Sequence, residues 1–395
     1  MRSPILVLAL MPAAACAQGF EYGPRNTDFE PAFPEQTRAP FVESGAQPSV
    51  EVLADGLVHP WGIATLPDGA GWLVTERAGR LRHVAADGTL SEPIAGTPEV
   101  LAAGQGGMLD VALADDFAES GTIYLTYAKP VDGGSVTAAA RMTLADDMGS
   151  VSDVRDIFVQ EPPSTVTKHY GSRILTMPDG MLAVTTGEHS SDATRVFAQD
   201  LDKTYGKVIR ITPEGEAAPG NPFMDREGAV DTIWSYGHRN IQGATVGPDG
   251  ALWTIEHGPK GGDELNLTEA GLNYGWPVIS YGERYSGGEI GSGESAREGM
   301  EQPDYFWDPV IAPGGMDFHE GEAFAAWNGD LLIGSLNPGG VVRPRLEDGL
   351  VVEEERMLMD RGRIRDVEVQ EDGTFLVLTD FEDGAILRVS PANES

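Results

Sequence analysis

A strand pattern that recurs six times constrains the fold of this chain more than any other feature. Each unit has a short apolar strand, a turn often spelled Pro-Asp-Gly, and a second strand rich in Leu, Val, Thr and Trp. In several units a third strand follows, in which apolar and polar residues alternate. The first strands begin near residues 61, 108, 172, 241, 315 and 366. Alternation predicts strands with one buried face, and the glycine that opens each second strand is typical of a tight hairpin.

Radial repetition of small antiparallel sheets is the architecture of a β-propeller, which hides most strand edges. We therefore predict an all-β fold, a six-bladed β-propeller over residues 49–391. Residues 50–54 precede the first unit and are expected to pair as the outer strand of the last blade, which closes the ring. A pair of β-sandwiches is the alternative, but it needs two independent cores and gives no reason for a sixfold repeat. The 50 glycines and 27 prolines suit a protein of many short strands and turns.

The first residues have the pattern of an export signal. Residues 1–17 contain Arg2, an apolar run too short to cross a bilayer, and small residues before an expected cleavage after Ala17. Cys16 is the only cysteine, so it leaves a lipoprotein site as the alternative and excludes an internal disulfide. We expect a periplasmic protein without a transmembrane span. Residues 18–48 are Pro-rich and aperiodic, and we expect an N-terminal extension that lies over the surface or stays loose.

The charge of the chain narrows its range of partners. The formal net charge is -35 at pH 7, which repels the phosphate backbone of nucleic acids and anionic lipid headgroups. The sequence therefore argues against a nucleic-acid or membrane-surface role. Acidic residues also attract calcium, but composition alone does not locate a site.

Dense loop sequences lie between the third and fifth repeat units, where residues 233–287 combine two histidines, an Arg-Asn pair, an Asp-Glu pair and "NYGWP". A loop that only connects two strands does not need so many charged, aromatic and turn-forming residues. We therefore expect the functional residues in this region. With "GQGGMLDVAL", "KHYGSR", "TTGEHS", "YGKVIRI", "IAPGGM" and "RIRDV", these motifs stand in order along the repeat. The set resembles the soluble sugar dehydrogenases that depend on pyrroloquinoline quinone (PQQ), the glucose/sorbosone dehydrogenase family. The resemblance covers about residues 50–390.

The resemblance implies a six-bladed enzyme that oxidises the anomeric carbon of an aldose sugar to a lactone and passes electrons to an external acceptor. His169 matches the family's general base, and Glu188 matches the carboxylate that orients it. A neutral imidazole has a pKa suited to removing a hydroxyl proton. PQQ carries three carboxylates, so its site needs cations and forked donors. The positions that match the family's cofactor-binding residues are Gln105, Arg239, Asn240, Asn337, Arg363 and Arg365.

The resemblance also implies two calcium ions, which prefer oxygen ligands. One lies beside the quinone, where a cation acts as a Lewis acid, and its main-chain ligands match Gly258 and Pro259. The other is structural, and its carboxylate and carbonyl ligands match Glu264 and Tyr274.

Three residues depart from the family pattern. Asn337 stands where the family commonly has a lysine that reaches the cofactor, so one positive charge is missing. Ile241 replaces a proline. Lys168 precedes His169 where glucose-specific members carry aspartate, which favours the broader aldose branch. The sequence leaves open whether the protein is a monomer or a homodimer.

Two other functions remain open from the sequence. One is a calcium-dependent hydrolase of the lactonase or gluconolactonase kind, whose tunnel would be lined by carboxylates and asparagine around a metal. The arginines argue against it. The other is a propeller without catalysis that serves as a binding module, and Asn337 favours this reading. Convergence of Arg239, Arg363 and Arg365 with His169 on a common cavity is the arrangement that the redox function requires.

Overall fold

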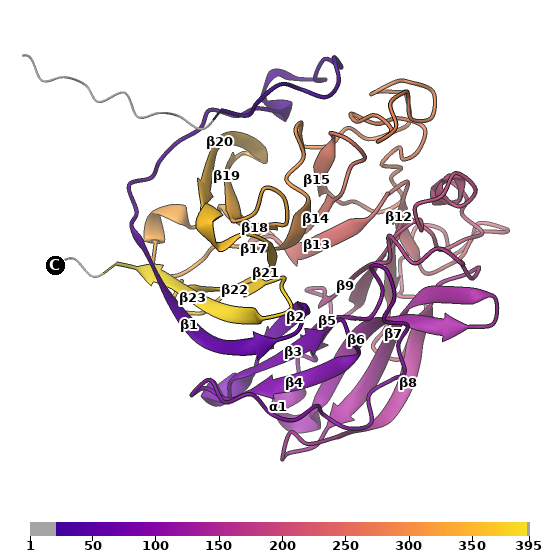
Figure 1. Ribbon diagram of the computed structural model, residues 1–395. Coiled ribbons are helices and arrows are strands. Elements are labelled where there is room, and N and C mark those ends of the chain that lie inside the picture. Colours follow the sequence, from indigo (N-terminus) through magenta and orange to yellow (C-terminus); the bar gives the residue numbers. More distant parts are fainter. Residues whose placement is uncertain (1–20, 393–395) are drawn as a thin grey trace, which may run out of the picture.

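The computed structural model describes residues 21–392, which form six antiparallel sheets around a common axis (Figure 1). Within this range five sheets have four strands and one has three. The innermost strands of the sheets contact one another in chain order, and the last contacts the first. The predicted all-β, six-bladed β-propeller is therefore confirmed, and the sandwich alternative is wrong.

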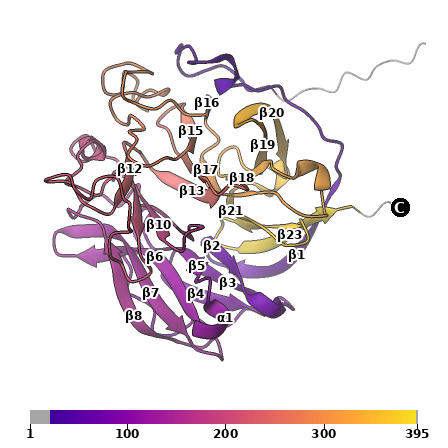
Figure 2. The same ribbon diagram turned by 180° about the vertical axis from the view of Figure 1, so that it is seen from behind.

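In blades one to five the strands follow one another in chain order from the axis outward, and Figure 2 shows the same ring from behind. Blade one holds β2 (Pro60–Thr65), β3 (Trp72–Glu76) and β4 (Arg80–Val84), and blade two holds β5 (Met108–Leu113), β6 (Thr122–Val131), β7 (Gly134–Leu144) and β8 (Val151–Val159). Blade three holds β9 (Gly171–Thr176), β10 (Leu182–Thr186), β11 (Lys207–Ile211) and β12 (Ile233–Tyr236), and blade four holds β13 (Ile241–Val246), β14 (Leu252–Glu256), β15 (Asp263–Leu267) and β16 (Tyr305–Trp307). Blade five holds β17 (Pro313–Phe318), β18 (Leu331–Ser335), β19 (Val341–Glu347) and β20 (Leu350–Met357), and blade six holds β21 (Ile364–Val369), β22 (Phe375–Thr379), β23 (Gly384–Pro391) and β1 (Pro48–Leu57). Helix is confined to short turns, of which α1 (Phe117–Ser120) is the one α-helical element in the described chain.

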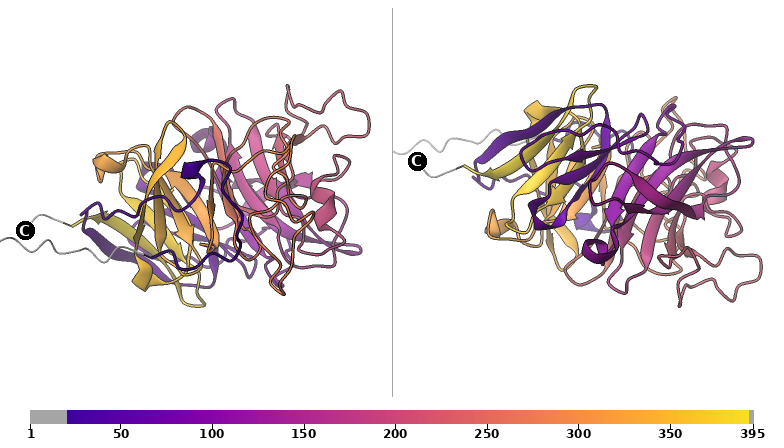
Figure 3. Two further views of the ribbon diagram at one scale, coloured as in Figure 1. Left: turned by 90° about the horizontal axis from the view of Figure 1, so that it is seen from above. Right: turned by 90° about the horizontal axis from the view of Figure 1, so that it is seen from below.

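The ring is closed by a strand from the N-terminal side of the chain. β1 pairs antiparallel with β23, with Val50 opposite Val389 and Val52 opposite Leu387. The views in Figure 1 and Figure 3 agree in placing these two strands side by side. The expected pairing of residues 50–54 with the last blade is confirmed. Blade one keeps three strands of its own because β1 serves blade six.

The Pro-Asp-Gly turns make their hairpins through the aspartate and the glycine. The Asp179 carboxylate accepts a hydrogen bond from the N–H of Met181 at 3.1 Å, which is the local contact that favours aspartate in turns. Gly180 has a φ of 77°, a conformation that glycine adopts without steric cost. This local chemistry explains why the tripeptide marks hairpins in the sequence.

The hydrophobic core lies between the faces of neighbouring blades. Leu73 of β3 packs in one cluster with Leu125 of β6, and Leu376 of β22 packs in another with Val74 of β3. Apolar clusters of the same kind join the other neighbouring pairs of blades. Each blade is therefore stabilised by the blades on both sides of it.

The N-terminal segment lies against blades four and five. The Asp308 carboxylate accepts hydrogen bonds from the backbone N–H groups of Asn26 at 2.9 Å and Thr27 at 3.1 Å. The turn Pro34–Gln36 contacts β16 and β20. The expected signal peptide, residues 1–17 with Cys16 and Ala17, lies outside the described residues. Among the described helices none is long and apolar enough to cross a membrane.

A buried ion cluster joins three inner strands at the axis. Arg173 of β9 donates to Asp110 of β5 at 3.1 Å and to Asp366 of β21 at 3.0 Å. All three side chains are at most 7% exposed. Burial raises the pKa of Asp110 to about 6, against the opposing effect of Arg173. Removal of the guanidinium would leave two carboxylates buried without compensation.

We predict that Arg173→Met lowers the free energy of unfolding by about 3–5 kcal/mol, the usual cost of breaking a buried ion pair. Urea unfolding at pH 7 measures it. The deficit should shrink at pH 5, because the two carboxylates can then take up protons. Arg297→Met is the matched control, since its pair with Glu294 is exposed and should contribute less than about 1 kcal/mol. A loss of the same size in both variants would contradict the prediction.

Candidate functional site

Two cavities lie at opposite ends of the propeller axis. Thr65, Leu113 and Val369, at the ends of three inner strands, line one of them. Gly171, at the start of β9, and residues that directly precede other inner strands line the second. Inner strands run in one direction along the axis of a propeller, so the cavities occupy opposite faces of the ring.

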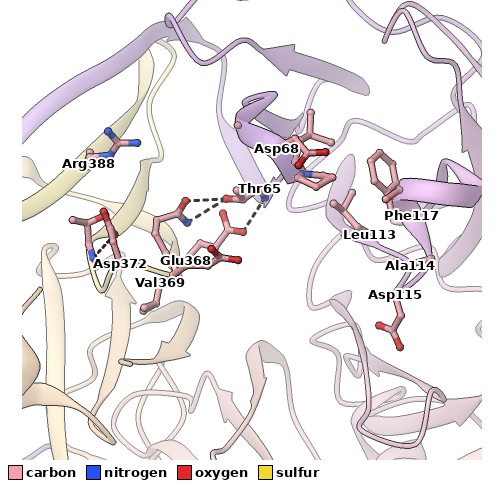
Figure 4. Close-up of a pocket in the computed structure, with 17 residues that line it drawn as sticks. Thr65, Asp68, Leu113, Ala114, Asp115, Phe117, Glu368, Val369, Asp372 and Arg388 are labelled. Carbon is pink, nitrogen blue, oxygen red and sulfur yellow. Dashed lines mark hydrogen bonds between the residues drawn. The ribbon is translucent and has the colours of Figure 1, made fainter. Parts of the chain in front are cut away.

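The larger cavity, of about 670 Å³, is lined mainly by acidic and apolar side chains (Figure 4). Asp68, Asp115 and Asp372 lie around it, and Glu368 accepts a hydrogen bond from the Thr65 N–H at 2.9 Å. Burial raises the pKa of Glu368 to about 8. None of the residues predicted for catalysis or cofactor binding lines this cavity. Its carboxylates would repel an anionic cofactor, so its larger size does not make it the active site.

The second cavity, of about 240 Å³, is cationic and gathers side chains from several blades. Four predicted cofactor residues line it, and they reach it from three different blades. Three of its lining residues are arginines, in a chain that has 27 Lys and Arg against 62 Asp and Glu. The predicted residues that line it are Gln105, Asn240, Arg363 and Arg365.

The arginines of this region have N–H groups left over for a ligand. The Nε atoms of Arg239 and Arg365 are buried and have no hydrogen-bond partner within the described part of the chain. Arg239 lies in the adjoining cavity, and His257 lines both cavities. Unsatisfied guanidinium groups are costly unless an anion pairs with them. The donor set therefore fits a ligand that carries several carboxylates.

His169 and Glu188 form a buried pair beside the cationic cavity. The His169 Nδ1 and Glu188 Oε1 atoms are 2.8 Å apart. The side chain of Gln105 accepts the backbone N–H of His169 at 2.8 Å, which links the pair to the cavity wall. His169 itself does not line the cavity, but the next residue, Tyr170, does. The Nε2 atom of His169 has no hydrogen-bond partner among residues 21–392.

The surroundings of this pair determine where its proton resides. Burial, together with the nearby Arg239, lowers the pKa of His169 well below its usual value. Burial raises the pKa of Glu188 to about 7, although Arg239 opposes this shift. At neutral pH we therefore take the imidazole as neutral, with Nδ1–H donated to Glu188 and a free lone pair on Nε2. An imidazole in this state can accept a proton from a substrate hydroxyl.

A small third cavity, of about 10 Å³, is lined by all four residues predicted to bind calcium. It holds about one water-sized sphere. The carbonyls of Gly258 and Pro259 accept no hydrogen bond from the described residues. Burial and the neighbouring Glu256 raise the pKa of Glu264 well above its usual value. A bound cation would offset the repulsion between these two carboxylates. Residues 21–392 contain no cluster of three or more His, Cys, Asp or Glu side chains suited to a metal. The four predicted calcium ligands that line this third cavity are Gly258, Pro259, Glu264 and Tyr274.

Asn337, another residue predicted to bind the cofactor, is not among the residues that line the cationic cavity. It is exposed, and its backbone N–H donates to the Ile311 carbonyl at 3.3 Å. The preceding residue, Leu336, lines the cavity in its place.

Three residues of the site region, Arg77, His257 and Asp380, were not predicted from the sequence. Arg77 and His257 line the cationic cavity, and Asp380 binds two of its arginines. Each of the three directly follows the second strand of its blade, as Leu336 does. Alignment of the second strands by repeat register could have found them, because equivalent positions in a propeller face the same end of the axis.

Comparisons with known proteins agree with this geometry. Residues 57–388 match the family described as Glucose / Sorbosone dehydrogenase. The chain is 45% identical over 350 residues to Aldose sugar dehydrogenase YliI of Escherichia coli (strain K12), over 87% of this chain and 93% of that protein.

Solved structures share the fold. The soluble aldose sugar dehydrogenase of Escherichia coli in the apo-form superposes with a TM-score of 0.84 at 44% identity, over 88% of this chain and all of that one. The PQQ-bound form of aldose sugar dehydrogenase from Streptomyces coelicolor gives 0.71 at 28% identity, over 87% of this chain and 98% of that one. With a match that spans most of its length, the chain belongs to the glucose/sorbosone dehydrogenase family of sugar dehydrogenases.

Proposed function

We propose that the protein is an exported, PQQ- and calcium-dependent aldose dehydrogenase that oxidises the anomeric carbon of a sugar to a lactone. Electrons then pass to an external acceptor. The observation that carries the proposal is the cationic cavity, where Arg363 and Arg365 meet Gln105 and Asn240 beside the His169–Glu188 pair. The names of the relatives support sugar oxidation, and one relative binds PQQ.

The residues that would hold PQQ are the forked donors of this cavity. Arg363, Arg365 and Arg77 offer guanidinium groups that pair with carboxylates. When bound, PQQ supplies an ortho-quinone that accepts the hydride of the anomeric C–H bond. Trp61 and Leu109 add apolar surface to the lining of the cavity.

His169 is the proposed general base. Its Nε2 lone pair takes the proton of the anomeric hydroxyl, and Glu188 stabilises the positive charge that then develops on the ring. The contact between Glu188 and Nδ1 also fixes the orientation of the imidazole. Oxidation removes one proton and one hydride from the sugar. Of these two, the protein's own residues accept the proton.

Calcium is proposed at the carbonyls of Gly258 and Pro259 and at the pair of Glu264 and Tyr274. Free carbonyls and an electrostatically crowded carboxylate are suitable ligands for this ion. Near the quinone, a cation would stabilise the negative charge that develops during oxidation.

The alternatives are less compatible with the site. A hydrolase of the lactonase kind needs carboxylates around a catalytic metal, whereas the cavity beside His169 is lined by arginines. A binding module would have no need for an imidazole with a free Nε2 held by a buried carboxylate.

The direct test is reconstitution. Purified apoprotein is incubated with PQQ and calcium, and reduction of a redox dye is followed after an aldose is added. We expect activity in the wild type and a loss of about 10²–10⁴-fold in kcat for His169→Ala, because the base is gone. His83→Ala is the control, since His83 is a partly exposed histidine whose Nε2 bonds the Ala70 carbonyl in blade one.

Two results would contradict the assignment. A folded wild type that reduces no dye would reject the redox function, and lactone hydrolysis by the same sample would favour the hydrolase. Full activity in His169→Ala would show that another group is the base.

The pH profile tests the His169–Glu188 pair. The base is competent only while the pair lacks its extra proton, so kcat/KM should fall as the pH drops through about 7, the pKa to which burial raises Glu188. Glu188→Gln should shift this decline to lower pH, because the remaining His169 pKa lies well below 6.5. Its maximal rate should also fall. An unchanged acid limb in the variant would contradict the coupling.

Calcium binding is tested by thermal unfolding. Chelation should lower Tm, and added calcium should restore it, because a ligand that binds only the folded state stabilises it. A Tm change of about 1 °C is expected for each kcal/mol in a chain of this size, because the entropy of unfolding grows with chain length. Glu264→Gln should reduce the response to calcium, whereas the exposed Glu320→Gln should keep it. Equal responses in both variants would exclude the Glu264 site.

A further inference from the structure

Asp380 is a buried carboxylate at the edge of the cationic cavity that the proposed chemistry does not use. It directly follows β22 and is 3% exposed. Its backbone N–H donates to the Arg363 carbonyl at 3.0 Å, so it is tied to the segment that leads into β21.

Both arginines of that segment bind one oxygen of this carboxylate. The Nη2 atoms of Arg363 and Arg365 donate to Asp380 Oδ2 at 2.7 and 2.8 Å. Without a shared anion, two guanidinium groups this close would repel each other. The second oxygen, Oδ1, is 3.0 Å from His59 Nδ1.

His59 connects this arrangement to the first blade. Its backbone N–H donates to the Phe381 carbonyl at 2.7 Å, and its carbonyl accepts the Arg77 N–H at 3.1 Å. Asp380 therefore lies at the seam where blade six meets blade one, with cavity arginines on both sides of the seam.

The hydrogen bonds to Asp380 orient the guanidinium groups of Arg363 and Arg365 but do not use all of their N–H donors. Arg363 Nη1 donates to the Leu336 carbonyl and Arg365 Nη1 to Gln242 Oε1, both at 3.2 Å. The Arg365 Nε has no partner among the described residues. A guanidinium has five N–H groups, so each arginine keeps donors for an anion.

We propose that Asp380 is a positioning residue that holds Arg363 and Arg365 as one preorganised fork for the carboxylates of the cofactor. The inference rests on the proposed function. A carboxylate in an anion site removes one positive charge, but it fixes two flexible side chains before the ligand arrives, which lowers the ordering cost of binding. Orientation matters more here because Asn337 supplies no additional cation.

Asp380 keeps its charge under all ordinary conditions. Burial opposes ionisation, but the arginines, led by Arg365, hold its pKa well below the usual range. Asp380 should therefore remain ionised between pH 5 and 9, and its two hydrogen bonds to the arginines should persist over this range.

The test measures PQQ affinity rather than turnover. Apoprotein is titrated with PQQ in the presence of calcium, and quenching of tryptophan fluorescence gives Kd. We expect Asp380→Asn to raise Kd about tenfold and Asp380→Ala to raise it further, as expected when a charged, hydrogen-bonded partner is lost.

Asp330→Asn is the matched control. Asp330 is also buried, at 4% exposure, and also binds an arginine, Arg343, but far from the cavity in blade five. We expect it to lower Tm and to leave PQQ affinity unchanged, which separates positioning from a general loss of stability.

If Asp380→Asn does not fold, His59→Ala provides the second variant. It removes the Oδ1 contact alone and should raise Kd about two- to fivefold. Non-additive effects of Asp380→Asn and Arg363→Gln in a double-mutant cycle would support action through the arginine.

The outcomes are distinct. Unchanged affinity in the folded variants would overturn the positioning role while leaving the proposed function intact. Tighter binding in Asp380→Asn would show that only net charge matters and would also overturn it. A wild type that does not bind PQQ would reject the proposed function and the fork together.

Discussion

The pairing of β1 with β23 is the constraint on which the rest of the structure depends. It joins the first strand of the propeller to the last one, and residues of blade six and blade one pack together in one apolar cluster. The contacts between His59 and Asp380 exist because of that closure. Arg77 approaches Arg363 and Arg365 in the same cavity for the same reason. This part of the candidate site therefore lies where blade six meets blade one.

Positive charge is scarce in this chain, but part of it is concentrated in one cavity. The formal net charge is -35, yet three arginines gather in one cavity of about 240 Å³. Arg173 is paired with two aspartates at the axis, and Arg365 is paired with Asp380 at the edge of the cationic cavity. What separates the two arginines is their place: Arg365 lines the cavity and Arg173 does not.

Much of the fold followed from sequence because strand alternation and hairpin turns are local properties. The six units and the closing strand were predicted from them. The site was predicted where short motifs carried it, as for Arg363 and Asn240, which line the cavity. Asp380 and Arg77 were not predicted, because their contacts depend on the ring closing: Asp380 meets a histidine 321 residues away. Asn337 was expected at the cofactor, but Leu336 takes that lining position.

The two cavities give the two faces of the ring opposite charges. Carboxylates line one end of the axis and guanidinium groups the other. Fields of this kind act before contact, since lined clefts steer small ions during diffusion. A polyanion that approaches the disc is turned away from one face and drawn towards the other. An anionic ligand would thereby enter from one side, and added salt, which screens such fields, should slow its capture more than it speeds its release.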